Sequence, residues 1–232
     1  MEFSRVLVLC FAFVLGASLG CSDDDDEGTA VIRVMHAAKT LGRLTVLLDD
    51  DEVSKPLAYT EASDGFEVVI ESEYIPRLRV FAEGIAPPVV DIDLFVLEDS
   101  RNILVVYTRP DDSIANTLLR QSEFELLGED FRLNIGHFAP SINTAIDAYI
   151  VNPDSSLDGQ IPAASGISFS TVSTEVDIRQ GIYESVVTRS RSLIALLRRG
   201  AFPFEAGRTF YAFFLDGTTR EEPLQLVFIA AD

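Results

Sequence analysis

The sequence has no tryptophan and is poor in the residues that carry most catalytic chemistry. Its 232 residues include two cysteines, two histidines and two lysines, Lys39 and Lys55. So few ligands and nucleophiles exclude most zinc sites, cysteine nucleophiles and Schiff-base chemistry. A phosphate-binding glycine loop and a His-Glu-x-x-His motif are absent as well. The single Gly-x-Ser-x-Gly match, Gly16–Gly20, lies in an apolar N-terminal run rather than at a strand-to-helix elbow. We therefore expect a non-enzymatic protein without a cofactor.

Basic residues are also scarce. Lysine and arginine number 18 against 37 aspartates and glutamates, which gives a formal net charge of −19. Such a surface repels phosphate backbones, so we expect no nucleic-acid partner. Apolar residues make up 47% of the chain, enough to bury a sizeable core.

The first twenty residues have the layout of a secretory signal. An apolar run, Val6–Gly20, follows Arg5, and small residues precede Cys21. A run of about fifteen residues is too short to cross a bilayer comfortably, so we expect residues 1–20 to be a cleaved signal peptide.

The segment around Cys21, Ala17-Ser18-Leu19-Gly20-Cys21, resembles the lipobox of bacterial lipoproteins. The resemblance implies that Cys21 becomes the first mature residue and carries acyl groups such as palmitate, which hold the protein at a membrane. Cleavage removes Cys10, so Cys21 would have no disulfide partner. In the enteric sorting rule for lipoproteins, Ser22 after the cysteine implies the outer membrane of the cell envelope. An ordinary secretory signal with an unmodified Cys21 is the alternative.

The segment that starts at Cys21, residues 21–29, carries a run of aspartates and has no large apolar side chain to bury. Like charges repel and extend a chain, so this segment is expected to act as an acidic tether.

An internal repeat organises the rest of the chain. Residues 32–38 match residues 133–139, which places His36 and His137 in register. Further matches join 44–48 to 146–150, 66–70 to 175–179, and 102–107 to 209–214. The sequence therefore predicts two modules of about 100 residues, at 30–127 and 131–232, joined near Gly128.

Within each module the apolar residues recur every second position. Phe66, Val68 and Ile70 alternate with polar neighbours, and Val176 and Ile178 do so in the second copy. This period is that of a strand with one buried face, and turn signals separate the runs. We predict an all-β protein of two tandem immunoglobulin-like antiparallel β-sandwich domains. Ser192–Leu197, the best candidate for a helix, is assigned to a short strand.

The repeated pattern resembles DUF4397, a bacterial β-sandwich domain of unknown function that is often found in tandem on secreted and lipid-anchored proteins. The best matches are residues 33–38 with Asp49 and Asp50, and residues 136–140 with Asp147. Thr45 stands where the family usually has aspartate. Because the family has no established activity, the resemblance implies fold and location rather than function.

The two histidines and the acidic turns are the candidates for chemistry. A histidine beside a carboxylate is able to act as a base or metal ligand, and Asp49–Glu52 offers oxygen ligands for Ca²⁺. One histidine in each module fits better with a structural role, in which the imidazole bonds to a neighbouring loop backbone. Asp91 and Asp93 share a strand face, as solvated carboxylates commonly do. The alternative is a Ca²⁺-dependent or His/carboxylate-based envelope enzyme or sensor.

One basic and aromatic segment departs from the acidic background and is the candidate binding site. Arginine forks bind carboxylates and phosphates, and a loop phenylalanine is able to anchor a partner. We favour a structural interpretation, with arginines at the solvent-exposed ends of a strand and phenylalanines folded over the sandwich edge. The candidate binding residues are Arg189, Arg191, Arg198, Arg199, Phe202 and Phe204.

These expectations combine into one hypothesis. The protein is a lipid-anchored envelope protein whose two sandwiches act as a spacer or as a binding module for a surface protein or a glycan. The longer loops of the second module, at 152–168 and 198–208, are the expected contact sites, because binding residues concentrate on loops held by a rigid scaffold.

The lipid anchor generates the first testable prediction. Mass spectrometry of the mature protein is expected to find Cys21 at the N-terminus with acyl groups attached. An unmodified N-terminus at any position would contradict the anchor.

Overall fold

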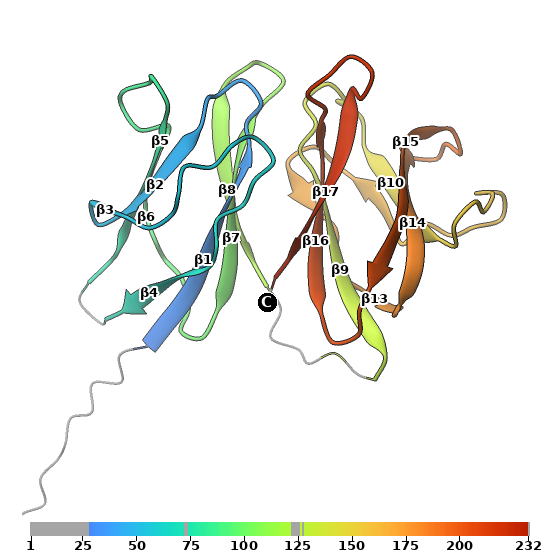
Figure 1. The fold of residues 1–232 in the computed structure, drawn as a ribbon, viewed down its shortest axis with the longest axis horizontal. Helices are drawn as coiled ribbons and strands as arrows, with labels where there is room; N and C mark the ends of the chain where they lie inside the picture. Colours follow the sequence, from blue (N-terminus) through green and yellow to red (C-terminus); the bar gives the residue numbers. More distant parts are fainter. Residues whose placement is uncertain (1–27, 72–73, 122–125, 127, 232) are drawn as a thin grey trace, which may run out of the picture.

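The computed structural model describes residues 28–71, 74–121, 126 and 128–231, and all of their regular structure is β-strand. Figure 1 shows two bodies of strands side by side. In this part of the chain no helix is long and apolar enough to cross a membrane. The predicted signal peptide, the lipidated Cys21 and most of the predicted tether lie outside the described residues.

Eight strands form the first sandwich, in two facing sheets with the orders β4-β1-β7-β8 and β3-β2-β5-β6. Leu44, Val68 and Leu104 are among the fully buried side chains between these sheets. The strands are β1 (Gly28–Ala37), β2 (Leu44–Leu48), β3 (Asp51–Glu52), β4 (Phe66–Ile70), β5 (Arg77–Ala82), β6 (Val90–Asp93), β7 (Arg101–Thr108) and β8 (Ile114–Arg120).

Nine strands form the second sandwich. Its sheets have the orders β12-β9-β16-β17, with β13 also paired to β9, and β11-β10-β14-β15. Phe131, Ile146 and Phe214 are buried between them. The strands are β9 (Asp130–His137), β10 (Ile146–Val151), β11 (Ala164–Ile167), β12 (Thr171–Val172), β13 (Val176–Arg179), β14 (Gly181–Arg189), β15 (Ala195–Phe204), β16 (Thr209–Asp216) and β17 (Leu224–Ala230).

Strand pairing confirms the prediction of an all-β fold built as sandwiches, and the two sandwiches repeat one topology. In each, the first strand pairs with a later strand in parallel, β1 with β7 and β9 with β16. All other paired strands run antiparallel. The wholly antiparallel pairing predicted from sequence is therefore wrong at one ladder in each sandwich.

The repeat is in register at the histidines but slips by one residue in two predicted matches. With His36 placed on His137, the shared pairing with the first strand makes Val106 equivalent to Phe214. The sequence match had placed Tyr107 there. A slip of one residue exchanges the two faces of a strand. Likewise Phe66 corresponds to Val176 rather than to Glu175, because these residues pair with Ile32 and Leu133.

Two element boundaries differ from the prediction. β1 includes Gly28 and Thr29, which the sequence assigns to the tether, because they pair with Ile70 and Val69 of β4. β15 runs from Ala195 to Phe204, where the sequence predicts a strand ending at Leu197 and then a loop. Its pairing with β14 continues through Phe204 after a register shift.

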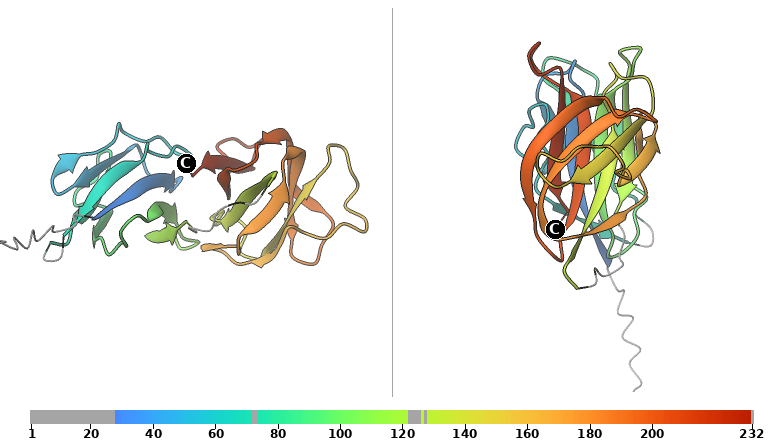
Figure 2. Two further views of the ribbon diagram at one scale, coloured as in Figure 1. Left: turned by 90° about the horizontal axis from the view of Figure 1, so that it is seen from below. Right: turned by 90° about the vertical axis from the view of Figure 1, so that its right-hand side faces the viewer.

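The two sandwiches pack against each other through their inner sheets. A cluster of buried side chains from β1, β7 and β8 meets buried side chains from β16 and from the residues that follow β9 and β17. The left view of Figure 2 shows the two sandwiches end to end, seen from below. The members of this interface cluster are Met35, Ala37, Ile103, Val105, Tyr107 and Ala115 from the first sandwich and Phe138, Tyr211, Phe213, Leu215 and Ala231 from the second.

Polar contacts fix the relative position of the two sandwiches at the edges of this cluster. The Tyr59 hydroxyl donates to the Asp216 carbonyl oxygen at 2.6 Å. The Arg33 guanidinium donates to the carbonyl oxygen of Ala230. At the centre, the rings of Tyr107 and Phe138 lie 5.0 Å apart. Apolar packing and directional bonds therefore hold the tandem as one body.

This interface generates a stability prediction. Phe213→Ala removes a fully buried ring from the cluster and is expected to lower the free energy of unfolding by about 3–5 kcal/mol in urea titrations. Ile161→Ala, at an exposed position in a loop of the second sandwich, is the control and is expected to change it by less than about 0.5 kcal/mol. Equal losses in the two variants would contradict a packed interface.

Candidate functional site

The histidine in the first sandwich forms hydrogen bonds with the loop that follows β1. Nε2 of the buried His36 lies 2.9 Å from the Gly42 carbonyl oxygen, and Nδ1 accepts from the Ala38 backbone N–H at 3.3 Å. These bonds assign the proton to Nε2 and use both ring nitrogens. Burial lowers the pKa of His36, while the Gly42 carbonyl and the charge of Glu61 oppose that shift. The imidazole therefore has the structural role that the sequence analysis favours.

The histidine in the second sandwich occupies the equivalent place. Nδ1 of His137 accepts from the Ala139 N–H at 3.4 Å, and the ring is buried against Phe169 and Phe214. Burial lowers its pKa, and the loop carbonyls of Thr144 and Ile142 oppose the shift. Both imidazoles are thus held neutral inside the protein.

Arginines engage the acidic residues that the sequence offers as calcium ligands. Asp49 accepts from the Arg77 backbone N–H at 2.8 Å, and Asp50 forms an ion pair with Arg79. The Arg77 guanidinium also binds both carboxylate oxygens of Asp91, which lowers the pKa of that carboxyl. No group of three or more potential metal ligands occurs within the described residues. These carboxylates serve charge pairing and turn formation.

The Asp147 carboxylate accepts hydrogen bonds from two separate segments of the second sandwich. It accepts from the Gly166 N–H at 2.7 Å and from the Arg191 N–H at 2.9 Å. Both of these residues have positive φ angles, 66° and 64°. The side chain therefore stabilises a left-handed backbone conformation at one residue of β11 and at one residue of the turn after β14. Thr45 is its counterpart in the first sandwich.

The four candidate arginines separate into two pairs along β14 and β15. Arg189 and Arg191 flank the turn between these strands, and both are exposed. Arg198 pairs with Val186 of β14 and Arg199 with Ser185. Val186 lies three residues before Arg189, so the pairs are roughly 10 Å apart along the sheet.

Arg198 is committed to a structural contact. Its Nη1 donates to Glu184 Oε2 at 2.5 Å, and both terminal nitrogens lie 3.5 Å from the Ser155 carbonyl oxygen. Ser155 belongs to the loop between β10 and β11, whose Leu157 packs on Tyr149 and Val186. Arg198 therefore holds this loop against the outer sheet.

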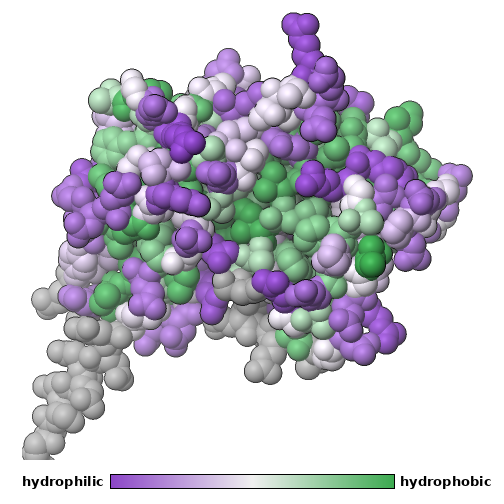
Figure 3. Space-filling view, viewed as in Figure 1, coloured by the Kyte–Doolittle hydropathy of each residue, from purple (hydrophilic) through white to green (hydrophobic). Residues whose placement is uncertain are grey.

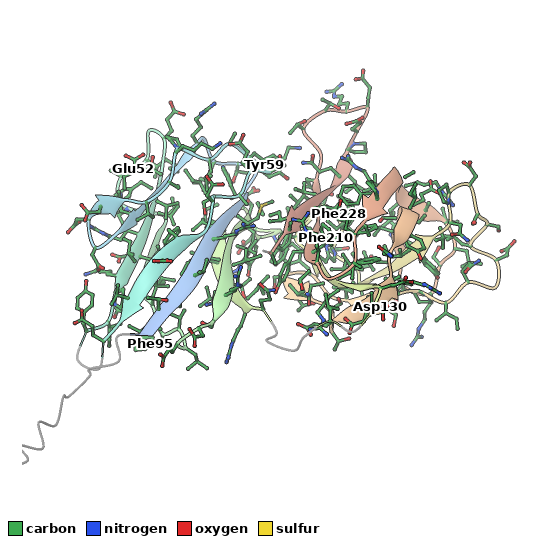
Figure 4. The ribbon with its side chains drawn as sticks, turned by 60° about the horizontal axis from the view of Figure 1, so that its bottom comes forward. Glu52, Tyr59, Phe95, Asp130, Phe210 and Phe228 are labelled. Carbon is green, nitrogen blue, oxygen red and sulfur yellow. The ribbon has the colours of Figure 1, made fainter. Side chains whose placement is uncertain are left out.

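The two candidate phenylalanines belong to the core rather than to an exposed loop. Phe204 is buried and stacks on Phe131 with ring centroids 4.4 Å apart. Phe202 is half-buried and stacks on Phe228 at 4.8 Å. Phe228 and Phe210, which also contacts Phe202, lie together inside the second sandwich in Figure 4. No loop presents these rings to a partner, because β15 continues through them and turns them inward.

A groove of about 350 Å³ has Arg198 and Arg199 in its lining, but neither Arg189 nor Arg191. One wall is the edge strand β15 and the other is the segment that leads into β17. Arginine side chains stand on the first wall and glutamates on the second, with leucines between them. The lining residues are Leu196, Leu197, Arg198, Arg199, Gly200, Glu221, Glu222, Pro223, Leu224 and Gln225.

Sequence reasoning missed the second wall of this groove. Glu221 and Glu222 lie more than twenty residues beyond Arg199, and no sequence pattern links them to the arginine segment. They meet β15 because β15 and β17 are the edge strands of the two sheets on the same side of the sandwich. A pairing order between sheets carries no local sequence signal, so no motif could have revealed it.

Comparisons with protein families and with curated proteins find no match to this chain. Among solved structures, the chain is similar to a carbohydrate-binding module of family CBM26 from Eubacterium rectale Amy13K, solved with maltoheptaose. The identity is 9% and the TM-score 0.26, over 85% of this chain and 95% of the module. A likeness of this level carries no argument about ligands, so the groove is interpreted from its own residues.

The buried histidines generate a pH prediction. Their folded pKa values are lowered, so below pH 6.5 the unfolded chain binds more protons and the histidine contribution to stability falls as pH falls. Each histidine contributes a slope of at most about 1.4 kcal/mol per pH unit. Melting temperatures from pH 7.5 to 5 are expected to fall more steeply for the wild type than for a variant with His36→Gln and His137→Gln. Parallel curves would contradict this account.

Proposed function

We propose that this protein is a non-enzymatic, lipid-anchored protein of the bacterial cell envelope, a tandem DUF4397-like lipoprotein anchored through Cys21. Its two sandwiches act as a rigid spacer, and the groove along β15 of the second sandwich binds an extended segment of another surface protein.

The fused interface is the observation that carries this proposal. Since the sandwiches share a buried apolar cluster, the groove is held at a fixed position relative to the N-terminal end of the first sandwich. A tethered pair of independent modules would sample many orientations, whereas a rigid tandem keeps its binding surface at one distance from the anchor.

The chemistry of the groove favours a protein segment over a glycan. Its walls offer both charges and its lining includes three leucines, Leu196, Leu197 and Leu224, while no aromatic ring lines it. β15 is also an edge strand, and the unpaired backbone groups of an edge strand are able to pair with an added strand. An extended peptide with alternating apolar and charged side chains matches both features.

The engaged state of the polar side chains supports a non-catalytic role. His36 uses both ring nitrogens in loop contacts, and the arginine-bound Asp91 stays ionised and is unsuited to act as an acid. These side chains hold turns and strands together in the described structure.

The groove generates a binding prediction. Arg199→Ala combined with Glu222→Ala is expected to reduce capture of a surface protein from envelope extract by about tenfold or more, because both walls lose a charged contact. Arg43→Ala, which removes an exposed arginine on the first sandwich, is the matched control and is expected to leave capture unchanged. Capture is quantified by pull-down with the mature chain, and circular dichroism checks that each variant is folded.

Two results would overturn this part of the proposal. Equal capture by the groove variant and the wild type would place the partner elsewhere on the surface. No capture by the wild type would leave the protein as a spacer without a partner.

A further inference from the structure

One end of the first sandwich exposes a cluster of large apolar side chains. Ten such side chains are exposed among the described residues, and four of them belong to two neighbouring loops. Tyr74 is 45% exposed, Ile75 49%, Phe95 74% and Leu97 57%. The loops are adjacent because the Leu94 N–H donates to the Pro76 carbonyl oxygen at 2.8 Å. We call these four residues the apolar tip.

The described chain begins at this same end. Gly28 pairs with Ile70 of β4, and an added Cβ at Gly28 would meet the Glu98 side chain at 2.5 Å. The Asp99 N–H donates to the Thr29 carbonyl oxygen at 2.7 Å, which fixes the loop of Phe95 and Leu97 beside β1. Figure 4 shows Phe95 at the end of the first sandwich where β1 begins. In Figure 3, apolar surface appears among polar residues at the lower end of the first sandwich.

We propose that the apolar tip rests on the bilayer surface to which Cys21 is anchored. This inference depends on the anchoring stated under the proposed function. Only seven residue steps separate Cys21 from Gly28, so their greatest span is about 25 Å. The tether thus keeps the tip close to the headgroups, where a high effective concentration allows a weak apolar contact to be occupied.

The composition of the tip fits the interfacial region of a membrane. Aromatic and aliphatic side chains in exposed loops insert at the level of the headgroups, where an apolar body and a polar end are both accommodated. Tyr74 has this character, since its hydroxyl is hydrogen-bonded to Asp49. Exposed apolar side chains gathered at one place are typical of an interaction site.

The charges around the tip define the kind of membrane. Glu71, Glu98 and Asp99 are exposed beside it, and the tether adds further aspartates. Anionic headgroups would repel these carboxylates across a short distance. The tip is therefore suited to zwitterionic phospholipid, and contact is expected to weaken as phosphatidylglycerol replaces phosphatidylcholine.

The absence of tryptophan gives this proposal a direct test. Phe95→Trp introduces a single tryptophan at the most exposed position of the tip. Ile161→Trp is the matched control, at an 89% exposed position in the loop between β10 and β11 of the second sandwich. Both full-length proteins, matured in a bacterial host, are incorporated into phosphatidylcholine vesicles with or without bromine on the acyl chains. Tryptophan emission is then measured.

The expected result is a blue-shifted emission for Phe95→Trp and quenching of about twofold or more by brominated lipid, with no change for Ile161→Trp. Leu97→Trp is a second reporter on the same loop, should Phe95→Trp fold poorly. It is expected to behave like Phe95→Trp.

Other outcomes overturn the proposal and identify which part fails. A chain that floats with the vesicles while its Phe95→Trp or Leu97→Trp emission matches the control is anchored but does not rest on its tip. A chain that does not float lacks the anchor, and both proposals fail. Shielding of the tip tryptophan only after addition of envelope extract would show that a protein, rather than lipid, covers it.

Discussion

Hydrophobic packing between the two inner sheets fixes the arrangement of the whole chain. β7 and β16 are buried on both faces, because one face lies in the core of their own sandwich and the other meets the neighbouring sandwich. Each large side chain buried there contributes about 1.5–3 kcal/mol. At the interface, positions that are equivalent in the two copies of the repeat carry different residues. Gly136 stands where the first copy has Met35, and a Cβ there would lie 2.8 Å from Phe138 and 3.0 Å from Phe213.

Because of this packing, the two proposed interaction sites lie on different sandwiches. The open edge of the second sandwich carries the groove, while the apolar tip lies where β1 begins in the first. Neither site has to move for the other to be used, because the Tyr59 and Arg33 contacts hold the sandwiches in register. Polar side chains outside the groove and the apolar tip mostly form hydrogen bonds or ion pairs with neighbouring segments, as Asp147 and Arg198 do. The proposed roles in anchoring, spacing and binding therefore use different surfaces of one body.

Much of the fold follows from the period of the apolar residues. Alternation predicted β4 and β13 and their buried faces, and the paired histidines predicted the repeat. Prediction failed where alternation stops. In β7 and β16 the apolar runs are continuous, so the register of the repeat had no polar face to fix it and slipped by one residue. Such continuous runs are typical of strands buried on both faces, but we predicted strands with only one buried face. The groove and the apolar tip were beyond reach, since both form from loops and edges brought together by topology.

The covered faces also explain why the module occurs twice. A single first sandwich would expose Met35, Ile103, Val105 and Tyr107 to water on its inner sheet, and such a patch promotes association. The second copy covers this patch with Phe138, Tyr211 and Phe213, so the tandem solves the solubility problem that each half presents. The second sandwich, which covers this patch, also extends the molecule away from the apolar tip. Solubility and the proposed reach from the membrane thus both depend on this one contact, and a change that loosens it would affect both together.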